Sequence, residues 1–226
     1  RVDQEKLAVD PGNRLLARGP RYRLDAEVIR DQALAVSGLM VELIGGKSVR
    51  PYQPAGLWKP VGFGGSNTSV FSQDKGEKLY RRSMYTFWKR TVPPPTMAIF
   101  DAPSRETCSV RRLNTNTPLQ ALVLQNDPQF LEAARALGDL MAAAGSPQDG
   151  IDLGAKRVLG RAPTTKELDV LSAALVRYRQ AYQSQAEKAR QLLASAGAPG
   201  SGDPVQVAWT LVASTLLNMD EAMTRQ

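Results

Sequence analysis

Four helix-start signals in the second half of the chain limit what it can fold into. Three of them pair an N-cap residue with a proline at the first helical position or with a capping box: Thr117-Pro118-Leu119-Gln120, Asp127-Pro128 and Thr164-Thr165-Lys166-Glu167. The fourth is Asp203-Pro204. No convincing strand alternation or internal repeat is present. The sequence therefore predicts a mainly α, irregular helical domain with long ordered loops and few or no strands.

Apolar spacing gives the expected extents of the helices. The spacing predicts helices from Asp127-Pro128 to Gly145, from Thr164 to about Leu193, and after Pro204. In the first half of the chain, apolar residues at spacings of three and four predict a helix from Leu24 to about Ile44, ended by Gly45-Gly46. Another helix is expected from Glu77 to Arg90, and Pro93-Pro94-Pro95 should stop it and favour an extended stretch.

A long irregular segment from Lys47 to about Gly76 separates the two helices of the first half. Unpaired backbone is costly to bury, so this segment should run over the surface as a strap pinned by its aromatic residues. The expected pins are Tyr52, Trp58, Phe63 and Phe71. A ligand-binding loop is the alternative interpretation.

The length and composition allow a substantial core, because the chain has 226 residues of which 42% are hydrophobic. We predict a single domain over 1–226, with a subdivision into 1–145 and 146–226 as the alternative and a flexible loop at 195–204. No apolar run of about 18 residues occurs, so no membrane span is expected. The N-terminus lacks the apolar core of a signal peptide. The protein is therefore either cytoplasmic or exported by a signal upstream of this sequence.

The chain has no histidine and one cysteine, Cys108. The absence of histidine removes Ser-His-Asp and Cys-His nucleophiles, histidine-based zinc sites and haem attachment through a C-x-x-C-H motif. No metal and no cofactor are expected in this chain. Cys108 lies next to basic residues that favour a thiolate, but a half-buried small hydrophobe is the preferred interpretation of a free cysteine.

The formal charge is +7, and the stretch from Tyr80 to Pro128 holds much of the basic and aromatic surface. Guanidinium groups bind carboxylate, phosphate or sulfate oxygens in pairs, and aromatic rings can stack on a sugar face. No nucleic-acid-binding signature accompanies the charge, so nucleic acid is not expected as a partner. The candidate residues for an anionic or glycan ligand are Arg81, Arg82, Tyr85, Trp88, Lys89, Arg105, Arg111, Arg112, Asn114 and Asn116.

Structural roles are the alternative for these residues. Arg81 and Arg82 would hold the irregular segment by pairing with acids such as Asp74, Glu77 or Asp101. The two asparagines would satisfy backbone groups before a helix. A hydrolase would need two carboxylates across a cleft, and the pairs available are Asp101 with Glu106 and Asp220 with Glu221. The second pair is better explained as a solvated helix end, and we assign no catalytic residue.

Long contiguous blocks of the chain resemble one family. They are RLDAEVIRDQALAVSGLM at 23–40, GGKSVRPYQPAGLW at 45–58, the central run from Tyr80 to Leu137, RAPTTKEL at 161–168 and AWTLVASTLLNMDEAMTR at 208–225. On these blocks the chain resembles the planctomycete-type domain of unknown function fifteen fifty-three over nearly its whole length, without the segment that opens the family.

The resemblance implies a C-terminal domain of large exported proteins, periplasmic or on the cell surface. Such proteins carry another uncharacterised domain ahead of this one and frequently an N-terminal cytochrome c-like module. Haem c would then lie in an upstream module rather than in this chain, and the upstream modules would be its partners. The family has no established activity and no catalytic residues to carry over.

The residues and the resemblance together favour a non-catalytic scaffold or binding module of an exported multidomain protein linked to polysaccharide metabolism. Its ligand would be an acidic or sulfated polysaccharide. Two alternatives stay open. The domain could be a docking or structural partner of a cytochrome c-like redox module, or a hydrolase acting on polysaccharide.

Overall fold

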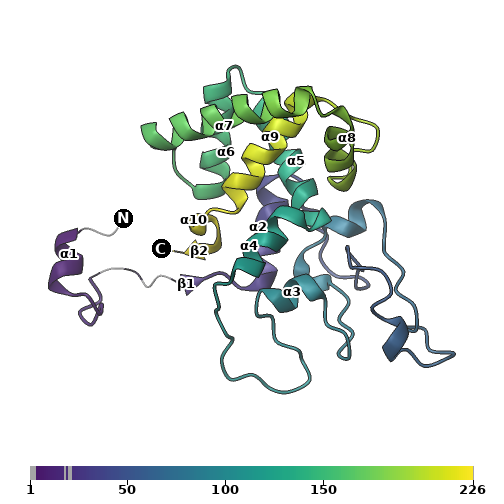
Figure 1. Ribbon diagram of the computed structural model, residues 1–226. Coiled ribbons are helices and arrows are strands. Elements are labelled where there is room, and N and C mark those ends of the chain that lie inside the picture. The colour runs from purple at the N-terminus through teal and green to yellow at the C-terminus, as the bar shows by residue number, and fades with distance from the viewer. Residues whose placement is uncertain (1–3, 18, 20–21, 226) are drawn as a thin grey trace.

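The computed structural model describes residues 4–17, 19 and 22–225, and this part of the chain is mainly helical (Figure 1). The predicted fold class is confirmed. Residues 1–3, 18, 20–21 and 226, which the predicted domain includes, lie outside the described residues. The α-helices are α1 (Gln4–Val9), α2 (Ala26–Val36), α3 (Pro95–Ile99), α4 (Pro118–Asn126), α5 (Pro128–Ala142), α6 (Pro147–Leu159), α7 (Thr165–Gln183), α8 (Ala186–Ser195), α9 (Pro204–Leu217) and α10 (Asp220–Met223). The short 3-10 helices are η1 (Lys59–Val61), η2 (Gly76–Tyr80) and η3 (Ser83–Tyr85).

Two short strands join regions that are far apart in the sequence. β1 (Tyr22–Arg23) pairs antiparallel with β2 (Thr224–Arg225), and Tyr22 lies opposite Arg225. The pairing fixes the chain just before α2 against the residues that follow α10. No helix in the described residues combines the length and the apolar character that crossing a membrane requires.

The four predicted helix starts are confirmed by their N-caps. Capping boxes begin α4 and α7, as the sequence predicts. At α5 and α9, the carboxylates of Asp127 and Asp203 accept hydrogen bonds of 2.9 Å from the backbone N–H groups of Gln129 and Val205. These caps satisfy amide groups that have no partner inside the helix, which is why a local sequence pattern is enough to place them.

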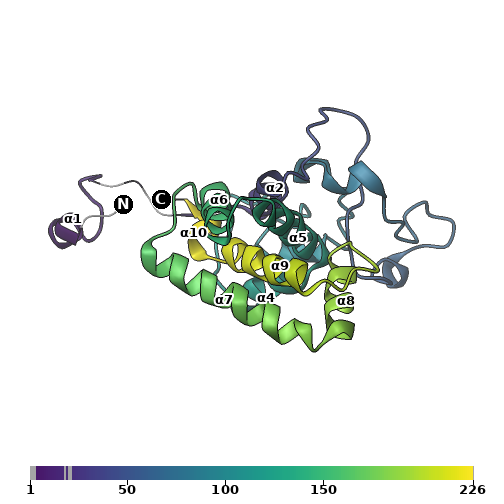
Figure 2. The same ribbon diagram turned by 90° about the horizontal axis from the view of Figure 1, so that it is seen from above.

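Helix α9 lies in the centre of the core, between α5 and α7 (Figure 2). The fully buried apolar side chains include Leu137 and Met141 of α5 and Val212 and Leu216 of α9. The same buried cluster contains residues of α2, α3 and α10. Core residues therefore come from both sides of position 145, and a subdivision there stays a prediction. This core supports the irregular segments that carry the candidate site.

The helix predicted from Leu24 to Ile44 is too long. Helix α2 ends at Val36, and Gly38 adopts a left-handed conformation with φ of 78°. Glycine reverses the chain there without a steric penalty, so the helix stops two residues after Leu34, its last buried residue. Leu43, expected on the buried face, is 59% exposed.

The helix predicted over 77–90 is wrong. Residues 76–80 and 83–85 form the short 3-10 helices η2 and η3, and several backbone groups between residues 79 and 83 are bound by tertiary partners. The carbonyl groups of Leu79 and Arg81 accept hydrogen bonds from the Arg30 guanidinium at 2.7 and 2.8 Å. The N–H of Ser83 donates to the Asp31 carboxylate at 2.7 Å. These contacts compete with a regular helix, and amphipathic spacing alone does not reveal them.

The long helix predicted from Thr164 to Leu193 is divided. Helix α7 ends at Gln183, and α8 begins at Ala186. No glycine or proline marks the turn between them. The turn allows Ala189 and Leu193 of α8 to be buried against Val207 of α9. The break is therefore a result of tertiary packing.

Two prolines begin helices that the sequence analysis does not predict. Pro95 is the first residue of α3, so the proline triplet is extended only up to Pro94. Pro147 is the first residue of α6, and Ser146 caps that helix by accepting a hydrogen bond from the N–H of Asp149. The fixed φ of proline suits the first helical position, where its missing N–H costs nothing.

Aromatic side chains pin the irregular segment, but fewer than expected. Trp58 is buried, and its ring packs edge-on against Phe71 with 5.2 Å between the centroids. Tyr52 donates a hydrogen bond of 2.9 Å to Glu132 of α5. Phe63 is 83% exposed, so its predicted anchoring role is wrong. Mobility of the loop at 195–204 stays a prediction.

Candidate functional site

The predicted ligand residues fall into several groups, and the first group is structural. The Arg81 guanidinium donates to the carbonyl groups of Lys47 and Leu43 at 2.9 and 2.7 Å, and also to that of Gly45. It lies 3.9 Å from the ring centroid of Tyr85, whose hydroxyl accepts a hydrogen bond from the Gly45 N–H. Arg81 is buried. It therefore holds the irregular segment through backbone carbonyls, not through the acids that the sequence suggested.

Arg82 and Lys89 do not take part in the contact between Arg81 and Tyr85. The Arg82 side chain is 55% exposed, and its Nε lies 3.8 Å from the Asp31 carboxylate. The Lys89 ammonium donates to the Thr68 carbonyl at 2.7 Å and lies 4.9 Å from the Trp58 ring centroid. Lys89 is thus engaged in holding the irregular segment, whereas Arg82 remains accessible.

An exposed loop over residues 101–117 carries the other predicted arginines. The indole N–H of Trp88 donates to the Ser104 carbonyl at 2.9 Å. The Arg105 guanidinium lies over the Trp88 ring, 4.4 Å from its centroid. An arginine that stacks on an aromatic face keeps its N–H groups free to donate in the plane of the guanidinium. Trp88 and Arg105 therefore form a stacked pair at the start of the loop.

A second contact fixes the loop to α2. The Arg112 guanidinium binds both oxygens of Glu27, at 2.6 and 3.3 Å, and lies 3.4 Å from Asp25. Burial by itself would raise the pKa of Glu27, but the hydrogen bonds from Arg112 and the charges of Arg112 and Arg105 hold that pKa below its usual value. The same contact raises the pKa of Arg112. Arg112 thus binds the Glu27 carboxylate directly, and the charge of Arg105 also acts on it.

The base of the loop is closed by Asp101. Its carboxylate accepts hydrogen bonds of 2.7 Å from both the N–H and the hydroxyl of Thr115. Arg111, Asn114 and Asn116 are exposed, and their side chains make no hydrogen bond within the described part of the chain. The structure therefore leaves these three side chains free on a loop whose ends are fixed.

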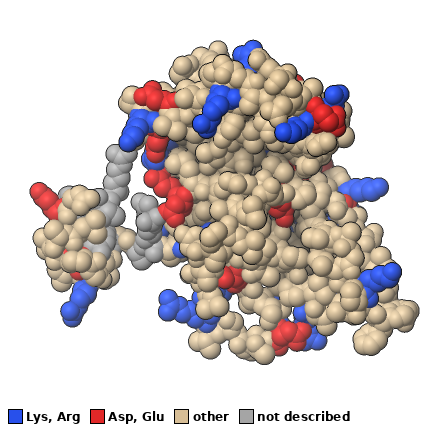
Figure 3. Space-filling view, viewed as in Figure 1, with Lys and Arg blue, Asp and Glu red and all other residues tan. Residues whose placement is uncertain are grey.

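The +7 charge is not concentrated in one broad patch on the face shown in Figure 3. Lys and Arg side chains are scattered over this face and alternate with Asp and Glu. On this face, specific recognition of an anion would depend on local geometry and not on a broad positive field. The Arg105 guanidinium stacked on Trp88, together with the exposed Arg111 on the same loop, offers such local geometry.

Cys108 lies on the same loop and is exposed. The expectation of a half-buried position is wrong. The loop runs over the surface between its fixed ends, so it has no core to contribute to. Within each pair of carboxylates considered for hydrolysis, one member has a structural contact: Asp101 binds Thr115, and Glu221 lies 2.8 Å from Arg161.

Sequence reasoning missed a buried carboxylate on α5. Glu132 is buried and accepts hydrogen bonds from the hydroxyls of Tyr52 and Tyr80, at 2.9 and 2.7 Å. Its partners are 80 and 52 residues away in the sequence, so no local pattern marks the cluster. A β-carbon at Gly197 would lie 2.6 Å from the Glu132 carboxylate, which explains a glycine in the connection after α8. The cluster fastens the irregular segment to the core.

The hydrogen bonds to Glu132 should make the free energy of unfolding fall at alkaline pH. Burial and the hydrogen bond to Glu132 raise the pKa of Tyr80 to about 12. Because this folded-state pKa lies above the ordinary value near 10, the stabilisation is complete below pH 10 and is lost between about pH 10 and pH 12. We expect urea unfolding of Tyr80→Phe to show a shallower loss of stability over this range than the unchanged protein. Equal slopes for the two proteins would contradict the assignment.

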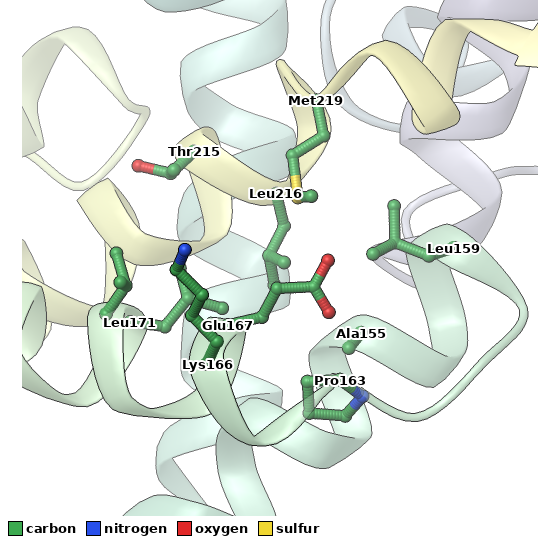
Figure 4. A pocket seen from close by; sticks show the side chains of 10 residues that line it. Ala155, Leu159, Pro163, Lys166, Glu167, Leu171, Thr215, Leu216 and Met219 are labelled. Atoms are coloured by element: carbon green, nitrogen blue, oxygen red, sulfur yellow. The ribbon is translucent and has the colours of Figure 1, made fainter.

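A separate apolar pocket lies between α6, α7 and α9. Its volume is about 310 Å³, and Figure 4 shows Leu159, Leu216 and Met219 around the same space. The Glu167 carboxylate at this pocket is already bound to Arg161 at 2.8 Å. The pocket therefore offers mainly apolar contact. Within the described residues, no three acidic or cysteine side chains are placed to hold a metal ion.

These features define a mainly helical module in which buried arginine and glutamate side chains fix an irregular central segment, and in which one anchored loop presents accessible arginine. The chain belongs to the PSD1 family, described as a protein of unknown function (DUF1553), whose profile matches residues 1–175. The resemblance found in the sequence is thereby confirmed, and its extension beyond position 175 stays a prediction. Comparisons with curated proteins and with solved structures give no match.

Proposed function

We propose that this domain is a non-catalytic module that binds acidic or sulfated polysaccharide through the 101–117 loop. The observation that carries the proposal is the Arg105 guanidinium stacked on Trp88, with the exposed Arg111 on the same anchored loop. Sulfate and carboxylate groups accept paired hydrogen bonds from guanidinium groups. A polymer that carries such groups at intervals could contact both arginines.

The anchoring of the loop supports binding. Three contacts restrain it, from Trp88 to Ser104, from Asp101 to Thr115 and from Arg112 to Glu27. A loop that is already ordered loses less conformational entropy when a ligand binds. Arg112 has its own carboxylate partners, so we assign it to the support of the loop and assign ligand contact to Arg105 and Arg111.

The setting of the module is part of the same proposal. An exported, multidomain protein would bring this domain to polysaccharide outside the cell, as the family resemblance implies. The upstream modules, including any that carry haem c, would then be partners within one polypeptide. No catalytic residue is assigned in this chain.

The test is binding of the purified chain to neutral, carboxylated and sulfated polysaccharides at low and high salt. We expect selective binding of one anionic class that persists at moderate salt. Arg105→Ala should raise Kd by about tenfold to a hundredfold, because a charge-assisted hydrogen bond contributes about 1.5–3 kcal/mol. Arg111→Ala should weaken binding in the same direction.

Arg177→Ala is the matched control. Arg177 is exposed on α7 and lies against Tyr178, so the variant loses one positive charge but leaves the loop intact. Kd should be unchanged in this variant. Equal losses for Arg105→Ala and Arg177→Ala, or binding to every polyanion that vanishes with salt, would reduce the effect to net charge and refute the proposal.

Docking to an upstream module is the second candidate function, and the apolar pocket at α6, α7 and α9 favours it. Val170 lines this pocket and is exposed. An apolar side chain of a neighbouring module would gain contact there without breaking a hydrogen bond. Val170→Asp should then abolish binding of the separately produced upstream modules and leave polysaccharide binding unchanged. Unchanged docking in this variant would exclude the pocket.

A further inference from the structure

A polar groove lies on the side of the core where α8 packs against α5, α7 and α9. Its volume is about 560 Å³. Small-molecule sites in proteins typically have volumes of about 300–1,000 Å³. None of the described residues that line the groove belongs to the 101–117 loop. The groove is therefore a separate part of the surface with room for a small ligand.

The most buried lining residues form a floor that is largely apolar. Leu131 of α5 is buried there, and Leu192 of α8 and Leu211 of α9 are half-buried. One polar residue interrupts this floor. Ser214 of α9 is 6% exposed, and its hydroxyl makes no hydrogen bond within the described part of the chain. A ligand that fills the groove must therefore offer apolar contact and also a polar group for Ser214.

The rim of the groove carries neutral polar side chains. The side chains of Gln125 of α4 and Tyr178 of α7 make no hydrogen bond within the residues that the structure describes. The amide NH₂ of Asn126 donates to a carbonyl of its own helix at 2.8 Å, and that of Gln191 donates to a carboxylate of its own helix at 3.2 Å. Both amides keep their oxygen as an acceptor. The rim thus presents free donors and free acceptors together.

This mixture selects the chemical class of the ligand. Among the described lining residues no Asp or Glu occurs, and Lys188 is the one charged side chain. An anion accepts hydrogen bonds but donates none, so it would leave the amide oxygens unused. A hydrocarbon would use none of the polar groups, and separate water molecules would gain nothing from the leucine floor. A hydroxyl group both donates and accepts, and a sugar ring adds an apolar face of C–H groups.

We propose that the groove binds a neutral saccharide of one or two units. The apolar face of a sugar ring would lie on Leu192 and Leu211, and its hydroxyl groups would exchange hydrogen bonds with Gln125, Tyr178 and Ser214. The inference goes beyond the proposed function, because it concerns an uncharged sugar and a surface that the 101–117 loop does not reach into.

Titration of the purified chain with neutral disaccharides, followed by backbone-amide NMR spectra, tests the proposal. The probes are disaccharides built from glucose, galactose, mannose, xylose and fucose. We expect at least one of them to give saturable shifts at residues 188–195 and 211–215, with a Kd that does not change with salt, because the ligand is uncharged. Absence of saturable shifts with every probe would overturn the proposal. Shifts confined to residues 101–117 would also overturn it, while the proposed binding of acidic polysaccharide by the loop would stand.

Variants of the rim give the second readout. Gln125→Ala and Tyr178→Phe each remove one polar group, so each should raise Kd about twofold to tenfold, as expected for the loss of one neutral hydrogen bond. Gln180→Ala is the matched control, because Gln180 is an exposed amide of α7 outside the groove, and its Kd should be unchanged. Arg105→Ala should also leave Kd for the disaccharide unchanged. Unchanged Kd in both rim variants, or an equal loss in Gln180→Ala, would refute the assignment.

Discussion

Replacing Arg30 with alanine should lower the free energy of unfolding by about 4 kcal/mol or more, since each buried polar group left without its partner costs about 1–3 kcal/mol. The Arg30 side chain is buried and donates to four acceptors in two parts of the chain, on Leu79, Arg81 and Ser83 and on Gln129 of α5. Alanine would leave these groups buried with no donor and would open a cavity beside them. The effect should concentrate in residues 79–83, whose turns depend on Arg30.

Urea unfolding followed by circular dichroism measures this loss, and Arg82→Ala is the control. Arg82 lies in the 79–83 stretch that Arg30 contacts. Its side chain is exposed and lies 3.8 Å from the Asp31 carboxylate, so its loss should lower the free energy of unfolding by less than about 0.5 kcal/mol. Arg30→Lys retains a charge but supplies fewer donors, and its stability should lie between those of the unchanged protein and Arg30→Ala. A cost for Arg30→Ala similar to that of Arg82→Ala would show that the acceptors find other partners.

The parts of the fold that the sequence predicts are those that depend on local chemistry. An N-cap such as Thr117 or Asp127 satisfies amide groups within the next three residues, so a short stretch of sequence is enough to predict it. The helix predicted over 77–90 fails for the opposite reason. Its backbone partners are Arg30 and Asp31, about fifty residues earlier. No window along the chain contains both sides of this interaction.

The candidate site shows the same limit at the level of single residues. Arg81 and Arg82 are adjacent and chemically identical, yet Arg81 is buried and Arg82 is exposed. The backbone is non-helical at both positions, with ψ of 154° at Arg81 and 143° at Arg82, and the two side chains point in different directions. The helix predicted over 77–90 did not distinguish the two side chains. The type of residue at the site was therefore predictable, but its accessibility depended on the local backbone.

Loop 101–117 was easier to select because its residues are close in sequence. Arg105, Arg111 and Arg112 are within eight positions, counting both ends, whereas the stacking of Arg105 on Trp88 and the pairing of Arg112 with Glu27 needed the structure. Glu132 could not be selected at all. Of its two tyrosine partners, Tyr52 belongs to the irregular segment and Tyr80 to η2, and the spacing of α5 gives no reason to expect a buried carboxylate there.

Replacing Gly138 with alanine should destabilise the protein by about 2 kcal/mol, and valine should cost more than about 3 kcal/mol, because enlarging a residue in a packed core forces the backbone to shift. Alanine is the better helix former by about 1 kcal/mol, so propensity alone predicts the opposite sign. A β-carbon at Gly138 of α5 would lie 2.8 Å from the carbonyl carbon of Trp209 and 2.9 Å from the Thr210 nitrogen of α9. Both atoms are backbone, so neither can rotate away.

Gly145→Ala is the control for the Gly138 variants. Gly145 follows α5, and a β-carbon there would have its nearest neighbour at an ordinary distance of 3.7 Å, so stability should change by less than about 0.5 kcal/mol. Thermal unfolding of the three variants measures the comparison. If Gly138→Ala were as stable as the unchanged protein, α5 and α9 could separate at no cost, and their close contact would not be what orders the core. Since α5 also carries Gln129 and Glu132, a real separation should weaken the attachment of the irregular segment as well, which proteolysis of residues 47–76 would report.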